Sequence, residues 1–219
     1  MAITRITSPA ITSVASTAIS GTLPAANIND TSISNITALP AGVGGKVLQV
    51  VQTHSDSTSS QSLSDDSTTN ISGLNATITP SSTSSKIKIT CRWNGEISNL
   101  ANEALLFGLR RDTTIIGNQS SVGSRASNMQ QMASGYAGGQ DAASTMDSAV
   151  WFYMDSPSST SAITYHATVI WYAGGTQTLY NNRTVNDNND ENHERATSTI
   201  ILEEIAGWSI KLFIIHIQK

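Results

Sequence analysis

The sequence has little of several residue types, and each shortage excludes a class of protein. Its one cysteine, Cys91, excludes an intrachain disulfide framework and any cysteine-rich zinc module. Charged residues make up only 13% of the 219 residues, and the net charge of −4 excludes the basic character typical of nucleic-acid binding. The most apolar stretch, residues 208–217, is shorter than the roughly 20 residues that a membrane-spanning helix needs. We therefore expect neither a nucleic-acid partner nor insertion into a membrane.

Small polar residues, above all serine and threonine, are abundant instead. Hydrophobic residues still make up 38% of the chain, which is too many for a wholly disordered protein of such low net charge. This composition is typical of an all-β protein exposed on a cell or particle surface. Residues 1–10 contain one arginine and no long apolar core, so we expect no signal peptide. A surface protein without a signal fits a virion part that cell lysis releases.

The first 41 residues differ in pattern from the rest of the chain. Aliphatic residues stand singly among small polar ones, and Pro9, Pro24 and Pro40 interrupt any long helix. One copy of such a segment cannot bury enough apolar surface to offset the entropy lost on ordering, whereas parallel copies could share an axis. We predict an extended shaft or attachment arm over residues 1–41, with a disordered tail as the alternative. The aliphatic residues expected at a trimer axis are Ile19, Leu23, Ile28, Ile33, Ile36 and Leu39.

Residues 42–45 are rich in glycine and predict a hinge, after which a head domain of strands spans residues 46–206. Over residues 86–97 apolar and polar side chains alternate, which is the period of a half-buried strand. Further strands are expected at residues 46–53, 71–79, 105–112, 113–117, 149–155, 161–173, 176–184 and 196–205.

Three segments between these strands are predicted to be loops: residues 55–69, 118–144 and 186–194. The longest of them is expected to contain a short strand near residues 126–134. A helix over residues 98–109 competes with the strand interpretation, because good helix formers occur there. Eight to ten strands at this spacing predict a jelly-roll-like β-sandwich of two sheets.

Several short segments of the sequence follow one another in an order that resembles the one found in a known family of proteins. They include Gly45-Lys-Val-Leu-Gln-Val-Val51, Phe107-Gly-Leu-Arg-Arg-Asp-Thr-Thr-Ile-Ile-Gly117 and Arg195-Ala-Thr-Ser-Thr-Ile-Ile-Leu-Glu-Glu-Ile205. Over residues 20–206 this order resembles a family of virion proteins of tailed phages, often aquatic and cyanobacterial phages, that are described as tail-fibre or structural proteins. The resemblance implies a trimeric head like the C1q/TNF-type jelly rolls, a thin stalk, and no catalytic residues.

The apolar residues 207–219 depart from this family, whose members usually end near Ile205. The extension is interpreted as an added strand, a segment that seals the trimer, or a contact with another virion protein. The sequence does not choose among these.

Catalysis and metal binding find little support in the sequence. No nucleophile–acid pattern surrounds the histidines, and Glu203 and Glu204 point to opposite faces of a strand, so they cannot act as a carboxylate pair. Asp187, Asn189 and Glu191 alternate as calcium ligands do, but the glycine of an EF-hand loop is missing and Asn/Asp runs favour turns. We expect no enzyme activity, no cofactor and no resident metal.

The run Trp151, Phe152, Tyr153 and Met154 is apolar on both sides of its strand. Such a strand needs cover on both faces, so we predict that one side meets the core and the other a neighbouring subunit. A carbohydrate-binding platform is the alternative for these aromatic residues. Host contacts are expected from the loops, because rigid scaffolds place binding residues there. The candidates are Asn118, Gln119, Tyr136, Asp187, Asn189 and Glu191.

Together these features predict a phage fibre or spike subunit located in the virion. Its partners are two further copies of itself, other virion proteins through the arm, and a glycan of the host surface. A capsid decoration or cement protein that clamps the shell is the first alternative, because jelly-roll trimers with arms suit that role. A polysaccharide depolymerase is the second, although glutamate is sparse.

Overall fold

The computed structural model describes residues 46–98, 104–120, 123–132 and 145–207. These residues form eleven strands in two antiparallel sheets and contain no α-helix, so the all-β prediction is confirmed. The predicted arm with its six aliphatic residues, the hinge, Tyr136 and residues 208–219 lie outside the described residues.

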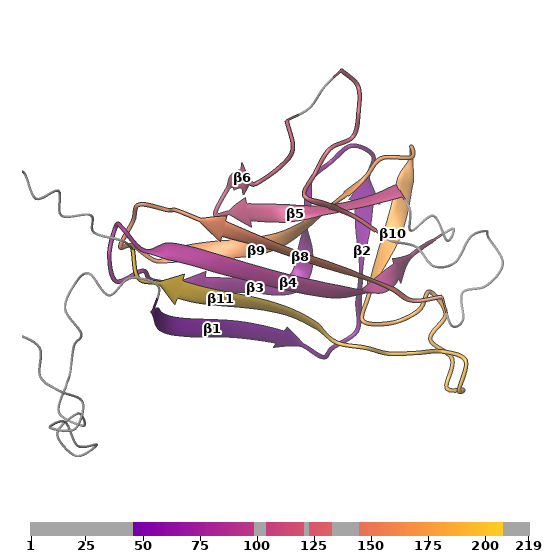
Figure 1. Ribbon diagram of the computed structural model, residues 1–219. Helices are drawn as coiled ribbons and strands as arrows, with labels where there is room; N and C mark the ends of the chain where they lie inside the picture. The colour runs from indigo at the N-terminus through magenta and orange to yellow at the C-terminus, as the bar shows by residue number, and fades with distance from the viewer. Residues whose placement is uncertain (1–45, 99–103, 121–122, 133–144, 208–219) are drawn as a thin grey trace, which may run out of the picture. The chain divides into compact units, whose positions relative to one another are not determined.

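The larger sheet, here called sheet A, is built around its longest strand, β4 (Figure 1). One edge of β4 pairs with β8, while the other edge pairs first with β11 and then with β10. β1 lies beyond β11, and β2 lies beyond β10. The free edge of β8 pairs with no other strand among the described residues. The strands are β1 (Val47–Ser55), β2 (Ser59–Ser64), β4 (Lys86–Ile97), β8 (Asp147–Asp155), β10 (Thr176–Asn181) and β11 (Ser198–Ile205).

The second sheet, sheet B, has the order β3-β9-β5 and continues with two short strands on the outer edge of β5. All of its pairs are antiparallel. Its strands are β3 (Thr69–Ile78), β5 (Leu105–Arg111), β6 (Thr114–Ile116), β7 (Gln130–Gln131) and β9 (Ile163–Trp171).

Side-chain alternation on the strands creates the core between the two sheets. On β4, Ile87, Ile89, Cys91 and Trp93 are fully buried, while Lys88 on the opposite face is exposed. This is the alternation that the sequence predicts, because successive side chains of a strand point to opposite faces. Burial without a compensating charge raises the pKa of the Cys91 thiol, so the cysteine acts as a small core residue.

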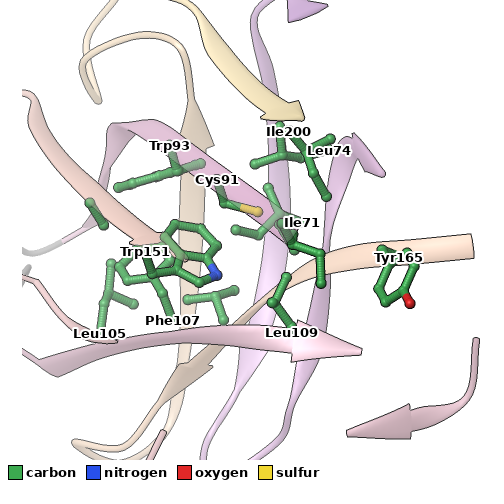
Figure 2. Close-up of a cluster of buried hydrophobic side chains, with 14 of the residues drawn as sticks. Ile71, Leu74, Cys91, Trp93, Leu105, Phe107, Leu109, Trp151, Tyr165 and Ile200 are labelled. Carbon is green, nitrogen blue, oxygen red and sulfur yellow. The ribbon is translucent and has the colours of Figure 1, made fainter. Parts of the chain in front are cut away.

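Three aromatic rings join the two sheets at the centre of this core (Figure 2). Phe107 of sheet B lies between Trp93 and Trp151 of sheet A, with ring centroids 5.1 and 5.2 Å apart. The Trp93 Nε1–H donates to Asn181 Oδ1 at 2.7 Å, and the Trp151 Nε1–H donates to the Gly108 carbonyl at 3.1 Å. Both indole donors are therefore satisfied although the rings are buried.

The prediction of a loop over residues 55–69 is wrong in part, because β2 lies within it. This strand is mostly polar, and among its residues only Leu63 is fully buried, so its apolar pattern is weak. Pairing with β10 over six residues defines it instead. The Gln61 side chain adds bonds to β3 by donating to the Asn70 carbonyl and accepting from the Ser72 amide.

Two other expectations about local structure are confirmed. Residues 105–111 form strand β5, whose first five residues are buried, so the helix alternative is excluded there; residues 99–103 lie outside the described part. The short strand expected near residues 126–134 is β7. Strand β2, which was not expected, brings the count in the described residues to eleven, one above the expected range of eight to ten.

Replacing Phe107 with alanine is expected to lower the free energy of unfolding by about 3–5 kcal/mol, because it leaves a cavity between two indole rings. Urea denaturation at neutral pH measures the change. Ile115→Ala on β6 is the control, since that side chain is 43% exposed and its loss should change stability by less than about 1 kcal/mol. Equal effects of the two substitutions would contradict the central role of the ring stack.

Candidate functional site

The outer face of sheet A carries an unusual amount of exposed apolar surface. Of the seven large hydrophobic side chains exposed in the described residues, six belong to its strands β1 and β8. Such side chains are usually scattered singly, and gathering on one face marks a contact surface. They are Val47, Leu48, Val50, Val150, Phe152 and Met154.

Strand pairing places one of these side chains from each of the two strands in the same row across the sheet. One row runs from Met154 on β8 to Val50 on β1. Between them lie Lys88 and Glu203, whose Nζ and Oε2 atoms form an ion pair at 2.5 Å. Because that pair is partly exposed, it contributes little to stability, and its charges neutralise each other in the middle of an otherwise apolar row.

The structure divides the predicted contact run on β8 between two faces. Phe152 is 75% exposed and Met154 is 46% exposed, so both are available to a neighbour. Trp151 belongs to the core, and Tyr153 is half-buried against it. The predicted contact surface thus reduces to alternate residues of β8, and β1 adds residues that the sequence reasoning missed. β1 has apolar residues at both odd and even positions, so its pattern gave no signal for an outer face.

A groove of about 330 Å³ runs beside β8. Its lining combines a residue predicted to contact the host with residues predicted to contact a neighbouring subunit. Gln119, a predicted host contact, lines it together with Phe152 and Tyr153. Gly117 lies in its wall with a φ of +72°, a conformation that favours glycine. A Cβ atom there would lie 3.0 Å from the Tyr153 ring, so a larger residue would intrude on the groove. None of the described residues that line it is charged.

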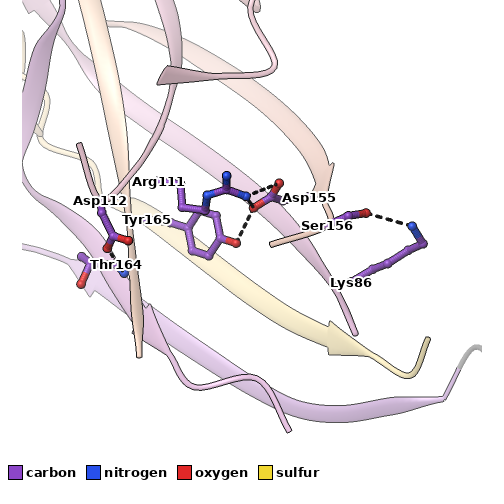
Figure 3. A network of polar contacts seen from close by, with 7 residues as sticks. All are labelled: Lys86, Arg111, Asp112, Asp155, Ser156, Thr164 and Tyr165. Carbon is purple, nitrogen blue, oxygen red and sulfur yellow. Dashed lines mark hydrogen bonds and ion pairs between the residues drawn. The ribbon is translucent and has the colours of Figure 1, made fainter. Parts of the chain in front are cut away.

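A polar network links the two sheets next to the end of β8 (Figure 3). Asp155 on β8 accepts both bonds from Arg111 Nη1 on β5, at 3.1 and 2.9 Å, and one from the Tyr165 hydroxyl on β9 at 2.7 Å. Asp155 is almost wholly buried, and these donors compensate its charge. Burial, the bond to Asp155 and the Asp155 charge raise the pKa of Tyr165. The network is structural, because its groups already satisfy one another.

The predicted loop over residues 186–194 is held by ion pairs. Asp187 accepts from Arg195 Nε at 2.9 Å and Nη2 at 2.7 Å, and this bidentate contact lowers the pKa of Asp187. Asp190 lies 2.6 Å from His193 Nδ1. Asn189 and Glu191 are exposed. The described residues gather no three His, Cys, Asp or Glu side chains that could hold a metal ion, and Arg195 occupies the first of the alternating oxygen ligands.

Comparison of the chain with known proteins assigns it to no family, so its class is judged from the fold. No protein-family model matches the chain, and no curated protein matches its sequence. In the described part, no helix has the length and apolar character needed to cross a membrane. The chain is an all-β protein whose two sheets share one core, with exposed apolar side chains on strands β1 and β8 of sheet A.

Stability is expected to fall above pH about 10, where an ordinary tyrosine ionises, because the unfolded chain then releases the Tyr165 proton that the folded chain retains. A folded-state pKa above the unfolded value adds stability that is complete below pH 10 and is lost as pH rises further. The free energy of unfolding of Tyr165→Phe should therefore fall less between pH 9 and pH 11 than that of the wild type. Urea denaturation at each pH measures the difference. Tyr180→Phe on β10 is the control, and an identical alkaline loss in both variants would contradict the assignment.

Proposed function

We propose that this chain is a non-enzymatic structural protein of a tailed-phage particle, a fibre or spike subunit with a trimeric head that attaches to the host surface. The proposal rests first on the apolar outer face of sheet A. A side chain such as Phe152, with three quarters of its surface exposed, costs free energy in water unless another molecule covers it. A second and a third copy of the chain are the partners proposed to do so.

The contrast between the two sheets supports this choice of face. In sheet B, Ile115 is the one large hydrophobic side chain that is exposed among the described residues. Other outer positions of this sheet are polar or charged, as for Thr77 and Thr164, whose hydroxyls are 2.8 Å apart, and for Arg110 and His166. A head that buries one sheet in an assembly and leaves the other in water should have this asymmetry. Strands β1 and β8 therefore form the proposed subunit contact, with Phe152 and Met154 on its β8 side.

The order of the strands supports a jelly roll. β1, β11, β4 and β8 are neighbours in sheet A, and β3, β9 and β5 are neighbours in sheet B. Among the described strands the chain passes from one sheet to the other six times, between β2 and β3, β3 and β4, β4 and β5, β7 and β8, β8 and β9, and β9 and β10. Repeated crossing between two antiparallel sheets is the pattern of jelly-roll domains.

Residues 1–41 complete the proposed subunit as a shaft or attachment arm. Their isolated aliphatics gain burial only from other chains, so joining three heads would order three arms around one axis. The arm is then the part that meets other virion proteins. The loops of the head are proposed to meet the host, and repetition of a weak contact over three copies raises the overall avidity.

Sedimentation equilibrium tests the assembly. The purified chain should sediment as a trimer at micromolar concentration, and Phe152→Asp should shift it to a monomer, because a charge at the centre of an apolar contact is desolvated without a partner. Ile115→Asp is the matched control on sheet B and should leave the trimer intact. A monomeric wild-type protein, or dissociation by the control alone, would overturn the proposed interface.

Electron microscopy of intact particles tests the location. Gold-labelled antibodies raised against residues 46–206 should bind to tails or tail fibres. Labelling of the head shell would replace the proposal with the capsid decoration role, and absence of the protein from purified particles would refute both.

A further inference from the structure

We propose that a hollow on the sheet B side of the head binds a neutral sugar ring. Its volume is about 440 Å³, and three separate segments build it: the turn between β2 and β3, residues 124–131, and the end of β9. The first two belong to the loops that the sequence predicts as host contacts. The inference rests on the proposed attachment function and names its ligand class. The walls are formed by Asp66, Leu106, Ser124, Arg125, Gln131 and Tyr172.

Asp66 occupies a firmly held turn. Its φ of +53° lies in the left-handed region, which aspartate tolerates better than most residues. The Asp66 amide donates to the Trp171 carbonyl at 2.8 Å, and the neighbouring Asp65 carboxylate accepts from the Gly174 amide at 2.8 Å. These bonds join the β2–β3 turn to the β9–β10 turn.

The carboxylate of Asp66 itself makes no hydrogen bond or ion pair within the described residues. The backbone of Asp66 is held in place while its carboxylate makes no bond to the described part of the chain, so the carboxylate is available to a ligand. Its two oxygens can accept from two adjacent hydroxyl groups, and hydrogen bonds to a charged acceptor are the stronger ones.

Tyr172 and Leu106 supply the hollow with an apolar surface. The Tyr172 ring packs against the core, and its hydroxyl accepts from Gln131 Nε2 at 3.3 Å. Leu106 on β5 is 8% exposed and lies beneath. A pyranose ring has hydroxyls at its rim and C–H groups on its face, so it suits a site whose lining includes both a carboxylate and an aromatic ring.

The charge of the lining favours a neutral ligand. One carboxylate and one guanidinium, those of Asp66 and Arg125, give the walls a formal charge of zero. The hollow in the 187–195 loop differs, because its carboxylates already bind Arg195 and His193. The groove beside β8 lies next to the proposed subunit contact, whereas Leu106 and Gln131 belong to sheet B, away from that face.

Isothermal titration of the full chain with glucose, galactose, mannose and N-acetylglucosamine tests the proposal, with N-acetylneuraminic acid as an anionic comparison. At least one neutral sugar should bind, and more tightly than the anionic one. Asp66→Asn should weaken binding about tenfold, the effect of losing a charge-assisted hydrogen bond. Asparagine also tolerates the left-handed conformation, so the fold should be kept. Asp56→Asn, which removes an exposed carboxylate from the β1–β2 turn, is the matched control and should leave affinity unchanged.

Tyr172→Ala provides a second variant and should abolish detectable binding, while thermal melting checks that it remains folded. Absence of binding by every neutral sugar, equal binding of the anionic sugar, or equal affinity of Asp66→Asn and wild type would each overturn the proposal. These outcomes are separate from the proposed function, because particle labelling and sedimentation do not depend on the hollow. A protein that binds sugar through Asp66 but is missing from particles would refute the virion role and leave the sugar site standing.

Discussion

The outward position of the exposed side chains on β8 depends on the aromatic stack between the sheets. Trp151 fills the core against Phe107, and its indole donates to the Gly108 carbonyl of the facing sheet. Since side chains alternate along a strand, burial of Trp151 obliges Phe152 to point outward. A slip of one residue in β8 would place Phe152 inside and would break the indole hydrogen bond, so the stack fixes the register. The exposure of Phe152 on the outside of sheet A is therefore a direct consequence of how the core is filled.

Buried polar groups complete this arrangement at the margins of the sheets. Glu204 on β11 is buried and accepts from the Ser81 amide at 2.7 Å, from the Ser81 hydroxyl at 2.6 Å and from Gln49 Nε2 at 2.6 Å. Asn182 adopts a φ of +61° and donates to the Ser55 and Ser57 carbonyls. Each group joins segments far apart in the sequence. Satisfied networks of this kind specify one arrangement of strands, which suits a chain with few charges.

The sequence pattern predicted which side chains face the core where one side of a strand is buried and the other is exposed to solvent. The alternation on β4 gave its core residues correctly, and the opposite faces of Glu203 and Glu204 are those that adjacency on a strand requires. The sequence did not predict β2, because this strand has few apolar residues and is held by its hydrogen bonds to β10.

The proposed sugar site depends on three segments of the chain that meet only in the folded head. Asp66 and Tyr172 are more than a hundred residues apart, and neither belongs to a motif that a single sequence reveals. The register between Asp65 and Trp171 brings them together. By contrast, the alternation of Asp187, Asn189 and Glu191 was visible in the sequence. Arg195 binds the Asp187 carboxylate in the folded chain, and this contact depends on the path of the loop, which the sequence does not reveal.

The solitary cysteine of the chain has a practical consequence. Cys91 is sealed inside the core, and its raised pKa keeps the thiol protonated and slow to react with alkylating reagents. A thiol engineered at an exposed position would then be the one site on the native head that a maleimide dye, a spin label or a gold cluster can modify. Single-site probes can thus be attached to this scaffold without first replacing its native sulfhydryl.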